Sequence, residues 1–277
     1  MFTQYTFNKY AILYSLKNNQ AEKNFLDLNN QQQLLKPIDK AHKKSTLSLV
    51  MILKNESKHL AACLDTVSDI VDEIIILDSG STDSTKEIAE KYNAKWHVNL
   101  DWQGFGKQRQ LAQTYATGDY VLVLDADERL DQPLRQAIAN VLNQPVQTDK
   151  VFSVARVNQF CGIEVQKRFL YADKLARLYA REHFQYSSLE VHESLDSKGV
   201  PVKRLDGYLM HLTNDDLHHF LLKNIRYSHD WATEKYNNGK QVNLLMVVLR
   251  SIFSFIREYI IRGDILGGAY GLFLAVA

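Results

Sequence analysis

The chain has 277 residues, of which 45% are hydrophobic and 23% are charged, and this is enough for one large domain or two small ones. Its net charge of +1 excludes binding to nucleic acid or another polyanion through bulk charge. The two cysteines, Cys63 and Cys161, form no CxxC motif and are typical of free thiols in a reducing compartment.

Residues 1–45 are predicted to be an N-terminal extension of the domain that follows. The segment is rich in Asn and Gln, and its first 44 residues contain no glycine. Aromatic residues such as Tyr10 and Tyr14 give it a weak apolar face that could pack on the domain, and a loosely ordered appendage is the alternative. Because no charged region followed by an apolar core is present, we expect no secretory signal.

Residues 46–145 alternate between predicted strands and predicted helices. Short apolar runs rich in β-branched residues predict the strands, and capping and turn residues mark the helix ends. The predicted strands are Leu47–Leu53, Glu73–Leu77, Lys95–Val98 and Tyr120–Leu124. The predicted helices run from Ser57 to about Val67, from the Ser79–Thr85 loop to about Asn93, from Lys107 to about Ala116, and from Asp131 and Pro133 to before Pro145. This alternation predicts βαβ units and a parallel sheet.

The run Tyr120–Leu124 is apolar on both faces, which is typical of a buried strand in the middle of a parallel sheet. It ends on Asp125-Ala126-Asp127-Glu128, and three carboxylates so close together are costly unless positive charge meets them. Ligands of open α/β sheets bind at this end of the strands, where carboxylates and substrate phosphates can share a divalent cation. The alternative interpretation is a solvated acidic turn.

Two other predicted strands also end in polar clusters, which are Asn55-Glu56 and Asp78-Ser79. The ends of parallel strands line one edge of a sheet, so an acidic edge with basic side chains nearby suits a nucleotide diphosphate bound through a metal. The basic residues are Lys54, Lys107 and Arg109. The chain has no P-loop motif, and GFGKQR matches only the first two glycines of a dinucleotide fingerprint, which excludes a P-loop ATPase and a Rossmann dehydrogenase.

Three stretches, VMILKNES, IIILDSGSTDST and ATGDYVLVLDADE, resemble in order and spacing the nucleotide half of a glycosyltransferase family 2 enzyme with the GT-A fold. The resemblance covers about Leu47 to Leu142. It implies that Asn55, Glu56 and Asp78 hold the uridine. It also implies that Asp125 and Asp127 bind Mg²⁺ or Mn²⁺, with Asp127 the more direct ligand. The nucleotide-sugar site that follows from it further includes Gly80, Asp83, Lys107, Arg109 and Ala126.

Residues 146–213 are predicted to form the acceptor-binding half of the same domain. The predicted strands are Val151–Phe160, Leu175–Tyr179, Pro201–Arg204 and Tyr208–Leu212. This half resembles the family 2 enzymes that build the inner core of lipopolysaccharide or lipooligosaccharide, through Arg177-Leu178-Tyr179, Val191-His192-Glu193 and His211. It departs from them because the loop around Phe169–Tyr171 has no tryptophan.

Three residues of this half are predicted to belong to the site. Glu193 is the predicted base that removes the acceptor hydroxyl proton, and the alternative is a carboxylate that pairs with a neighbouring Arg or His. His211 is predicted to be a third metal ligand or a diphosphate contact, and the alternative is a structural histidine. Arg177 could meet a phosphate or a donor hydroxyl, and a surface ion pair is equally consistent with the sequence.

Residues 214–277 are predicted to form a helical tail, with helices at Asp215–Asn238 and Val242–Ile261. The spacing of Arg250, Arg257 and Arg262 beside a broad apolar face is typical of a helix that lies in a membrane interface. A pair of core-packing helices is the alternative. No uncharged apolar stretch reaches the roughly 18 residues that a membrane span needs.

Together these features predict an α/β protein of the GT-A type, with a mostly parallel central sheet, flanking helices and a C-terminal helical tail. The resemblance implies an inverting, metal-dependent transferase that moves glucose from UDP-glucose to a heptose of a lipid-anchored inner-core oligosaccharide, at the cytoplasmic face of the bacterial inner membrane. Another UDP-sugar transferase of cell-surface glycan synthesis is the nearest alternative. A sugar nucleotidyltransferase and a non-catalytic membrane scaffold that binds Ca²⁺ remain as more distant ones.

Overall fold

The computed structural model describes residues 35–39, 42–160, 163–164, 172–187, 194–214 and 243–261, with residues 225, 228, 229, 231–233, 236, 239, 265, 271, 272, 275 and 276. The chain divides into two compact units: the larger comprises Gln31–Arg156 and Asp173–His211, and the other includes the C-terminal helix α8. The predictions that fall outside the described residues concern Glu193, Cys161, Arg262, most of residues 1–45 and most of the helix at Asp215–Asn238.

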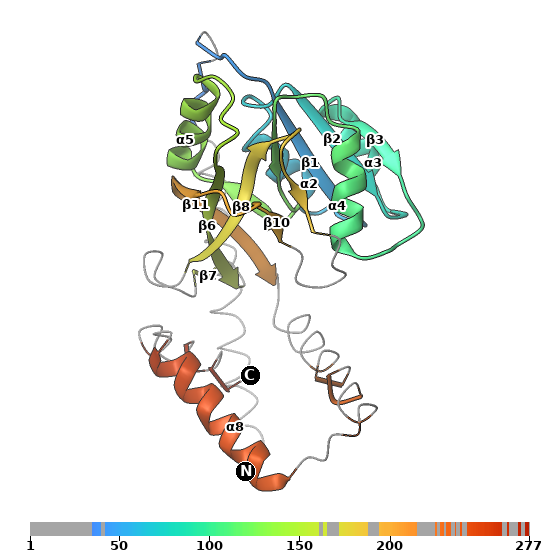
Figure 1. The fold of residues 1–277 in the computed structure, drawn as a ribbon. Helices are drawn as coiled ribbons and strands as arrows, with labels where there is room; N and C mark the ends of the chain where they lie inside the picture. The colour runs from blue at the N-terminus through green and yellow to red at the C-terminus, as the bar shows by residue number, and fades with distance from the viewer. Residues whose placement is uncertain are drawn as a thin grey trace, which may run out of the picture. The chain divides into compact units, whose positions relative to one another are not determined.

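Helices and strands alternate through the first half of the larger unit, and strands dominate the second half (Figure 1). The elements are β1 (Leu47–Leu53), α2 (Leu60–Asp65), β2 (Glu73–Asp78), α3 (Thr85–Lys91), β3 (Lys95–Val98), α4 (Phe105–Thr114), β4 (Tyr120–Val123), β5 (Glu128–Leu130), α5 (Gln132–Leu142), β6 (Val151–Phe160), β7 (Ile163–Glu164), β8 (Asp173–Ala180), β9 (Gln185–Tyr186), β10 (Leu195–Asp196) and β11 (Val202–Asn214). The main sheet has the order β3-β2-β1-β4-β8-β6-β11-β5, with β7 beside β6, while β9 pairs with β10.

Strands β3, β2, β1 and β4 are parallel, as the sequence predicts. Central β1 lies between β2 and β4, so that Val50 is opposite both Ile75 and Val123. Every residue of β1 is buried, because helices such as α4 pack against β1 and β2. Each Leu, Ile or Val side chain buried in this way contributes about 1.5–3 kcal/mol to folding, which makes these strands a firm base for the loops at their ends.

The other half of the main sheet is antiparallel where its pairings are described. β8 runs against β4 with Leu122 opposite Leu178, so the residue before Leu178 lies at the carboxyl end of β4. β11 runs against β5, which places His211 opposite Glu128. The α/β class and the flanking helices are therefore confirmed, and the antiparallel strands bring the second half of the chain to the acidic turn after β4.

Helix starts and strand lengths differ from the predictions at several positions. α2 begins at Leu60 instead of Ser57, and the backbone N–H of Ser57 donates to Asp83 of a neighbouring loop (3.1 Å). α4 begins at Phe105, two residues before the predicted start. The structure also has a strand, β5, that was not predicted after the acidic cluster, because β11 provides a pairing partner from far along the chain.

The two strands predicted at Pro201–Arg204 and Tyr208–Leu212 are one continuous strand, β11. Gly207 lies within it with φ 91°, and a Cβ there would stand 2.2 Å from the backbone nitrogen of Leu134. Glycine therefore allows β11 to pass close to the start of α5. The predicted start of α5 is confirmed, since Asp131 accepts hydrogen bonds from the backbone N–H groups of Leu134 (2.9 Å) and Tyr208 (3.0 Å).

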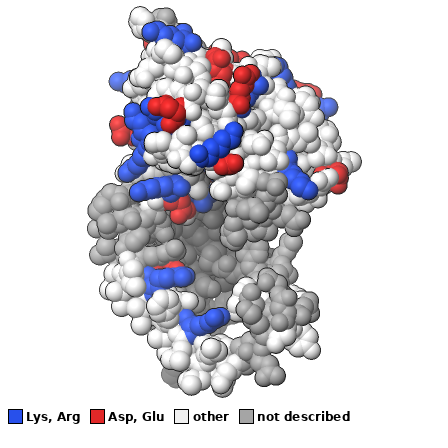
Figure 2. Space-filling model, in the orientation of Figure 1, with Lys and Arg blue, Asp and Glu red and all other residues white. Residues whose placement is uncertain are grey.

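The C-terminal part that the structure describes is helical. α8 (Leu244–Ile256) continues into the π-helical turn η1 (Arg257–Ile261), and Asn243 caps its start by accepting from the backbone N–H of Leu245 (2.9 Å). None of the residues of α8 is buried, and its surface in Figure 2 is largely white with blue groups at intervals. Within the described part of the chain, no helix combines the length and apolarity that crossing a membrane requires.

Candidate functional site

The parallel strands β1, β2 and β4 present their carboxyl ends at one edge of the sheet, which we call the carboxyl edge. Leu53 at the end of β1 is opposite Asp78 at the end of β2, and the Asp125 to Glu128 turn follows β4. The three loops that begin here contain most of the residues that the sequence predicts for nucleotide binding.

Asp78 organises the loop after β2. Its side chain is 3% exposed and accepts hydrogen bonds from the backbone N–H of Gly80 (3.0 Å) and of Ser81 (2.9 Å), and from the Ser81 hydroxyl (2.5 Å). Gly80 has φ 92°, in the left-handed region that glycine enters without strain. This carboxylate therefore holds the loop in a fixed shape at the edge of the sheet.

Asn55 and Asp83 join the loop after β1 to the loop after β2. Asn55 has φ 56°, and its amide oxygen accepts from the backbone N–H of Thr82 (2.8 Å). Asp83 accepts from the backbone N–H groups of Ser57 and Thr85 (both 3.1 Å). Hydrogen bonds from Thr85 and Ser57 lower the pKa of Asp83 to about 2, so this carboxylate is ionised and acts as a brace between the two loops.

Asp125 lies between two buried arginines. One of its carboxylate oxygens is 2.9 Å from Nη2 of Arg109, and the other is 3.0 Å from Nη2 of Arg177. Burial alone would raise the pKa of Asp125, but the two guanidiniums outweigh it and hold the pKa far below its usual range. Arg109, whose guanidinium also lies over the ring of Tyr186, and Arg177 thus contact Asp125, although the sequence predicted both to meet the substrate.

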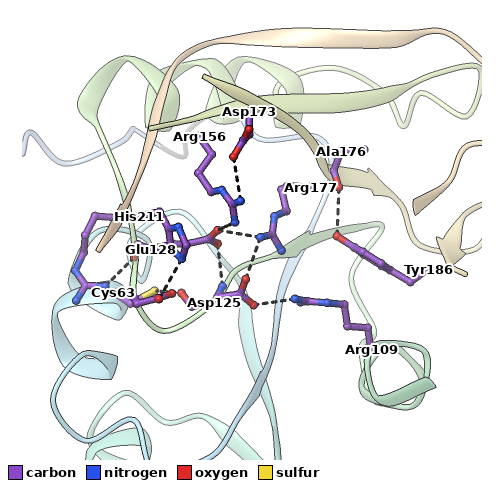
Figure 3. A network of polar contacts seen from close by, with 12 residues as sticks. Cys63, Arg109, Asp125, Glu128, Arg156, Asp173, Ala176, Arg177, Tyr186 and His211 are labelled. Atoms are coloured by element: carbon purple, nitrogen blue, oxygen red, sulfur yellow. Dashed lines mark hydrogen bonds and ion pairs between the residues drawn. The ribbon is translucent and has the colours of Figure 1, made fainter. Parts of the chain in front are cut away.

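Glu128 is fully buried and connects this pair to the rest of the sheet (Figure 3). One carboxylate oxygen accepts from the backbone N–H of Asp125 (2.9 Å), and the other from Nη2 of Arg177 (2.8 Å). Arg156 lies 3.8 Å away from it and pairs with Asp173 at 3.1 Å. Burial raises the pKa of Glu128, and Arg177 opposes that effect. The sequence analysis did not assign Glu128 to the site, although it stands in the same acidic cluster.

A third buried arginine holds the backbone of the acidic turn. Arg129 is 4% exposed and donates hydrogen bonds to the carbonyl oxygens of Ala126 (2.7 Å), Glu128 (2.8 Å) and His59 (2.9 Å). The sequence analysis missed this residue, because nothing local distinguishes a loop-bracing arginine from a solvated one. Nearby Cys63 is a free thiol, as predicted, and burial raises its pKa to about 12, which makes it unreactive.

Asp127 has different neighbours from Asp125. One of its oxygens is 3.1 Å from Nε2 of His211, which β11 places opposite Glu128, and the Asp127 side chain is 29% exposed. Glu56 belongs to the same cluster of charge: burial raises its pKa to about 7, with further contributions from Asp127, Asp125 and Asp83. The negative charges of Asp127 and Glu56 therefore repel each other, and Asp127, unlike Asp125, has no ion pair with an arginine among the residues that the structure describes.

The remaining predicted residues lie apart from this cluster or outside the description. Lys107 is exposed on α4, and its ammonium group donates to the side-chain oxygen of Gln103 (3.2 Å). Glu193 is among the residues that the structure does not describe. In the described part of the chain, no three His, Cys, Asp or Glu side chains are grouped in a way that could hold a metal by themselves.

Comparison with known proteins identifies the family of this domain. Residues 48–179 match the family described as Glycosyl transferase family 2. An uncharacterized glycosyltransferase of Rickettsia prowazekii (strain Madrid E) is 26% identical over 226 residues, which are 78% of this chain and 77% of that protein. The lipopolysaccharide core biosynthesis glycosyltransferase LpsC of Rhizobium meliloti (strain 1021) is 28% identical over 227 residues, which are 79% of this chain and 83% of that protein.

Among solved structures, S. aureus TarS in complex with UDP-GlcNAc shares 20% identity and a TM-score of 0.46, and the alignment covers 62% of this chain and 60% of that chain. The alignment thus spans less than two thirds of the crystallised protein. The family match, in contrast, agrees with the three motifs at the strand ends and favours a transferase over a nucleotidyltransferase or a calcium-binding scaffold. Residues 48–179 therefore form a glycosyltransferase family 2 domain, and the chain is a glycosyltransferase.

Proposed function

We propose that this chain is an inverting enzyme that transfers glucose from UDP-glucose to a heptose of the lipopolysaccharide or lipooligosaccharide inner core. The observation that carries the proposal is the contrast between Asp125, which two arginines neutralise, and the partly exposed Asp127, which contacts His211 and whose charge helps to raise the pKa of Glu56. The likeness to LpsC, whose name refers to lipopolysaccharide core biosynthesis, supports the acceptor class.

In this proposal the loops after β1 and β2 receive the uridine. The Asp78 carboxylate is already oriented by Gly80 and Ser81, and a carboxylate has further lone pairs that can accept the uracil N–H. Asn55 and Asp83 keep the two loops together, so the site is formed before the nucleotide arrives. Preorganisation of this kind lowers the entropy cost of binding.

The donor set fits a divalent metal shared with the substrate. A diphosphate has the same sign of charge as Glu56 and Asp127, so a cation between them makes its approach favourable. Asp127 and His211 would hold Mg²⁺ or Mn²⁺, and the diphosphate oxygens would supply further ligands, as is usual for Mg²⁺ sites with one or two protein carboxylates. When bound, the cation offsets the negative charge that develops on the leaving UDP.

Asp125 has a different role in this proposal. Both of its oxygens accept hydrogen bonds from arginines, so it orients the turn that presents Asp127. The transfer itself is one displacement: the acceptor oxygen bonds to C1 of glucose as the bond from C1 to the diphosphate oxygen breaks. Glu193 accepts the acceptor's hydroxyl proton, since a glutamate with a reference pKa of roughly 4.3 is ionised near neutral pH.

The proposal is tested by measuring UDP release from the full chain with Mn²⁺ or Mg²⁺ present. Purified inner-core oligosaccharide and UDP-glucose should give release that stops in excess chelator, and product analysis should show one added glucose in the opposite anomeric configuration to the donor. UDP-galactose and UDP-GlcNAc serve as donor controls. A faster reaction with either control would show that the donor is not UDP-glucose. Full activity in excess chelator would show that the reaction does not need a metal.

We further propose that the enzyme works at the cytoplasmic face of the inner membrane, with α8 and η1 in the lipid interface. The apolar side chains of this segment are exposed over most of its circumference; they are Leu244, Leu245, Met246, Val247, Val248, Leu249, Ile252, Phe253, Ile256, Ile260 and Ile261. Arg250, Ser254 and Arg257 follow one another at spacings of four and three, so they form one narrow polar stripe.

A lipid surface explains this pattern better than a docked protein. A protein partner would cover one side of the helix, whereas the acyl region of a bilayer can surround a broad apolar face and leave the arginines at anionic headgroups. At 1.5 Å per residue, the 13 residues of α8 extend for about 20 Å, which is less than the hydrocarbon thickness and suits a helix lying in the interface.

Flotation with anionic vesicles tests the membrane proposal. The wild-type chain should float, and Arg250→Gln with Arg257→Gln should weaken binding by about 30-fold at low salt, because each basic residue near the surface contributes about 1 kcal/mol. Lys86→Gln on α3, which removes a charge from an exposed pair with Glu90, is the matched control. Wild-type protein that stays at the bottom of the gradient would contradict the proposal.

A further inference from the structure

The loop between β3 and α4 carries an exposed pair of aromatic side chains that the proposed function does not use. Trp102 and Phe105 are 48% and 47% exposed, and their rings meet edge to face with centroids 4.9 Å apart. Exposing such large apolar rings to water is unfavourable, and burying them in a complex would recover that free energy.

Polar contacts attach this loop to the loop that Asp78 organises. Buried Gln108 donates from its side-chain nitrogen to the hydroxyl of Ser79 (3.0 Å), and its side-chain oxygen accepts from the side-chain nitrogen of Asn99 (2.8 Å). Asn99 also contacts Asp101 twice. The side-chain nitrogen of Asn99 donates to the carbonyl oxygen of Asp101 (3.1 Å), and the side-chain oxygen of Asn99 accepts from the backbone N–H of Asp101 (3.2 Å). The residue before Trp102 is therefore tied to the residue after Asp78.

Helix α4 gives a second, independent connection to the site. Phe105 and Arg109 are four residues apart, so they lie on the same face of α4, one turn from each other. Arg109 contacts Asp125 at 2.9 Å. The aromatic pair thus lies one helical turn from the acidic network and next to the loop that is proposed to hold the uridine.

We propose that Trp102 and Phe105 form a stacking platform for the nucleobase of the sugar donor. This inference rests on the proposed UDP-sugar donor and specifies how its base is held. A nucleobase has an apolar face, which stacks on aromatic rings, and a polar edge, which Asp78 can meet. The fixed loop keeps the rings in place before the donor binds, so little conformational entropy is lost on stacking.

The test compares UDP with inorganic pyrophosphate, which lacks the base, by calorimetry on the full chain in Mn²⁺. Trp102→Ala should weaken UDP binding about tenfold, within the range that one base–aromatic stack contributes, and should leave pyrophosphate binding unchanged. Trp102→Phe keeps a ring and should recover most of the lost UDP affinity. In a background that carries Trp96→Phe and Trp231→Phe, Trp102 is the one tryptophan left, and UDP should quench its fluorescence.

Each other outcome has a defined meaning. Equal loss of UDP and pyrophosphate affinity in Trp102→Ala would show a general defect of the site and overturn the platform. Unchanged UDP affinity with a raised KM for the acceptor would assign the rings to the acceptor sugar instead, and unchanged UDP affinity with weaker vesicle binding would assign them to the membrane. A wild-type chain that binds pyrophosphate and no UDP would overturn the proposed donor, which is a different result from a failure of the stacking.

Discussion

The two edges of the parallel strands both carry carboxylates, but these carboxylates have different surroundings. At the edge where the strands begin, which we call the amino edge, each carboxylate accepts hydrogen bonds from neighbouring segments. Asp72 accepts from the backbone N–H of Leu47 (2.7 Å), and Asp119 accepts from the backbone N–H and the hydroxyl of Thr46 (both 2.7 Å). The bonds from Thr46 lower the pKa of Asp119.

Glu73 shows the same pattern at the amino edge. Its carboxylate accepts from Ser48 (2.5 Å), from Lys95 (2.6 Å) and from the backbone N–H of Thr117 (2.5 Å). Burial raises the pKa of Glu73, but these bonds outweigh burial and lower it to about 2. At the carboxyl edge the pKa of Glu56 shifts in the opposite direction, because burial and neighbouring carboxylates raise it to about 7.

This difference indicates that the carboxylates at one edge of the sheet contribute to stability, whereas carboxylates at the other edge contribute to ligand binding. Carboxylates whose hydrogen bonds are made within the protein stabilise the strand starts, and they gain little from binding a ligand. At the carboxyl edge Asp78, Asp83 and Asp125 are satisfied in the same way, and the exception is Glu56 with Asp127. The charges of these two carboxylates repel each other until something positive binds, so this pair holds free energy that ligand binding can release. The predictions below test whether the two edges divide in this way.

Asp127→Asn should have the largest effect, on activity and not on folding. The substitution removes the proposed metal-binding charge from a partly exposed position that no arginine contacts in the described structure, so kcat/KM should fall about 10³-fold, or roughly 4 kcal/mol. The melting temperature should stay within about two degrees of wild type. UDP release assays and thermal unfolding measure the two, and retained activity would show that Asp127 is not a ligand.

Glu128→Gln should have the next largest effect, on stability. The buried charge of Arg177 then loses its 2.8 Å partner, and removing one member of a buried pair typically costs about 3 kcal/mol. Thermal and urea unfolding measure this loss. Activity per folded molecule should also fall, because the one side-chain oxygen of glutamine cannot accept from both Arg177 and the backbone N–H of Asp125, as Glu128 does. Arg156→Gln, which removes a more distant and partly exposed charge, is the matched control and should cost less.

The sequence predicted the strands and the acidic cluster because both depend on local patterns. The apolar runs at β1, β2 and β3 place those strands within a residue of their observed ends, and the polar residues after them follow directly. The roles of Asp125 and Glu128 depend on pairing between distant segments. Only the antiparallel register of β8 against β4 brings Arg177 to Asp125, and no local pattern around either residue encodes that register.

The same limit explains the smaller errors. Ser57 has the residue type of a helix cap, but α2 begins at Leu60, and Ser57 instead belongs to the loop that Asp83 holds through its backbone N–H. Glu128 was predicted to lie in the acidic cluster after the strand, without a strand of its own, yet pairing with His211 makes it part of β5. In each case a contact across the chain outweighs a local preference, and these contacts cluster around the site.

Glu73→Gln should have a moderate effect on stability and a small effect on activity. At pH 7 it should cost roughly 1–2 kcal/mol, because charge-assisted hydrogen bonds from Lys95 and Ser48 are weakened. The pKa of about 2 in the native protein lies below the usual glutamate value of 4.5, so the wild-type advantage is present above pH 4.5 and is lost as the pH falls toward 2. Urea unfolding at pH 7 and pH 3.5 should therefore show a smaller difference between the proteins at pH 3.5.

Glu56→Gln should have the smallest effect on stability, and it should stabilise the protein where Glu73→Gln destabilises it. In wild type the pKa of Glu56 in the native protein, about 7, lies above the usual glutamate value of 4.5, so the native state binds more protons than the unfolded state between these pH values. Stability of the metal-free protein therefore falls as the pH rises from about 4.5 to about 7, and the full cost of the buried charge applies above that range. A neutral glutamine avoids this cost.

The measurement is thermal unfolding in excess chelator at pH 5 and pH 8, with Glu73→Gln as the matched control from the other edge. Glu56→Gln should melt at the same temperature as wild type at pH 5 and a few degrees higher at pH 8, while Glu73→Gln should melt lower at both. UDP binding in Mn²⁺ should weaken in Glu56→Gln alone, because a carboxyl edge with less negative charge attracts the cation less. Destabilisation by Glu56→Gln at pH 8 would show that this carboxylate is satisfied in the folded protein, and the distinction between the two edges would then fail.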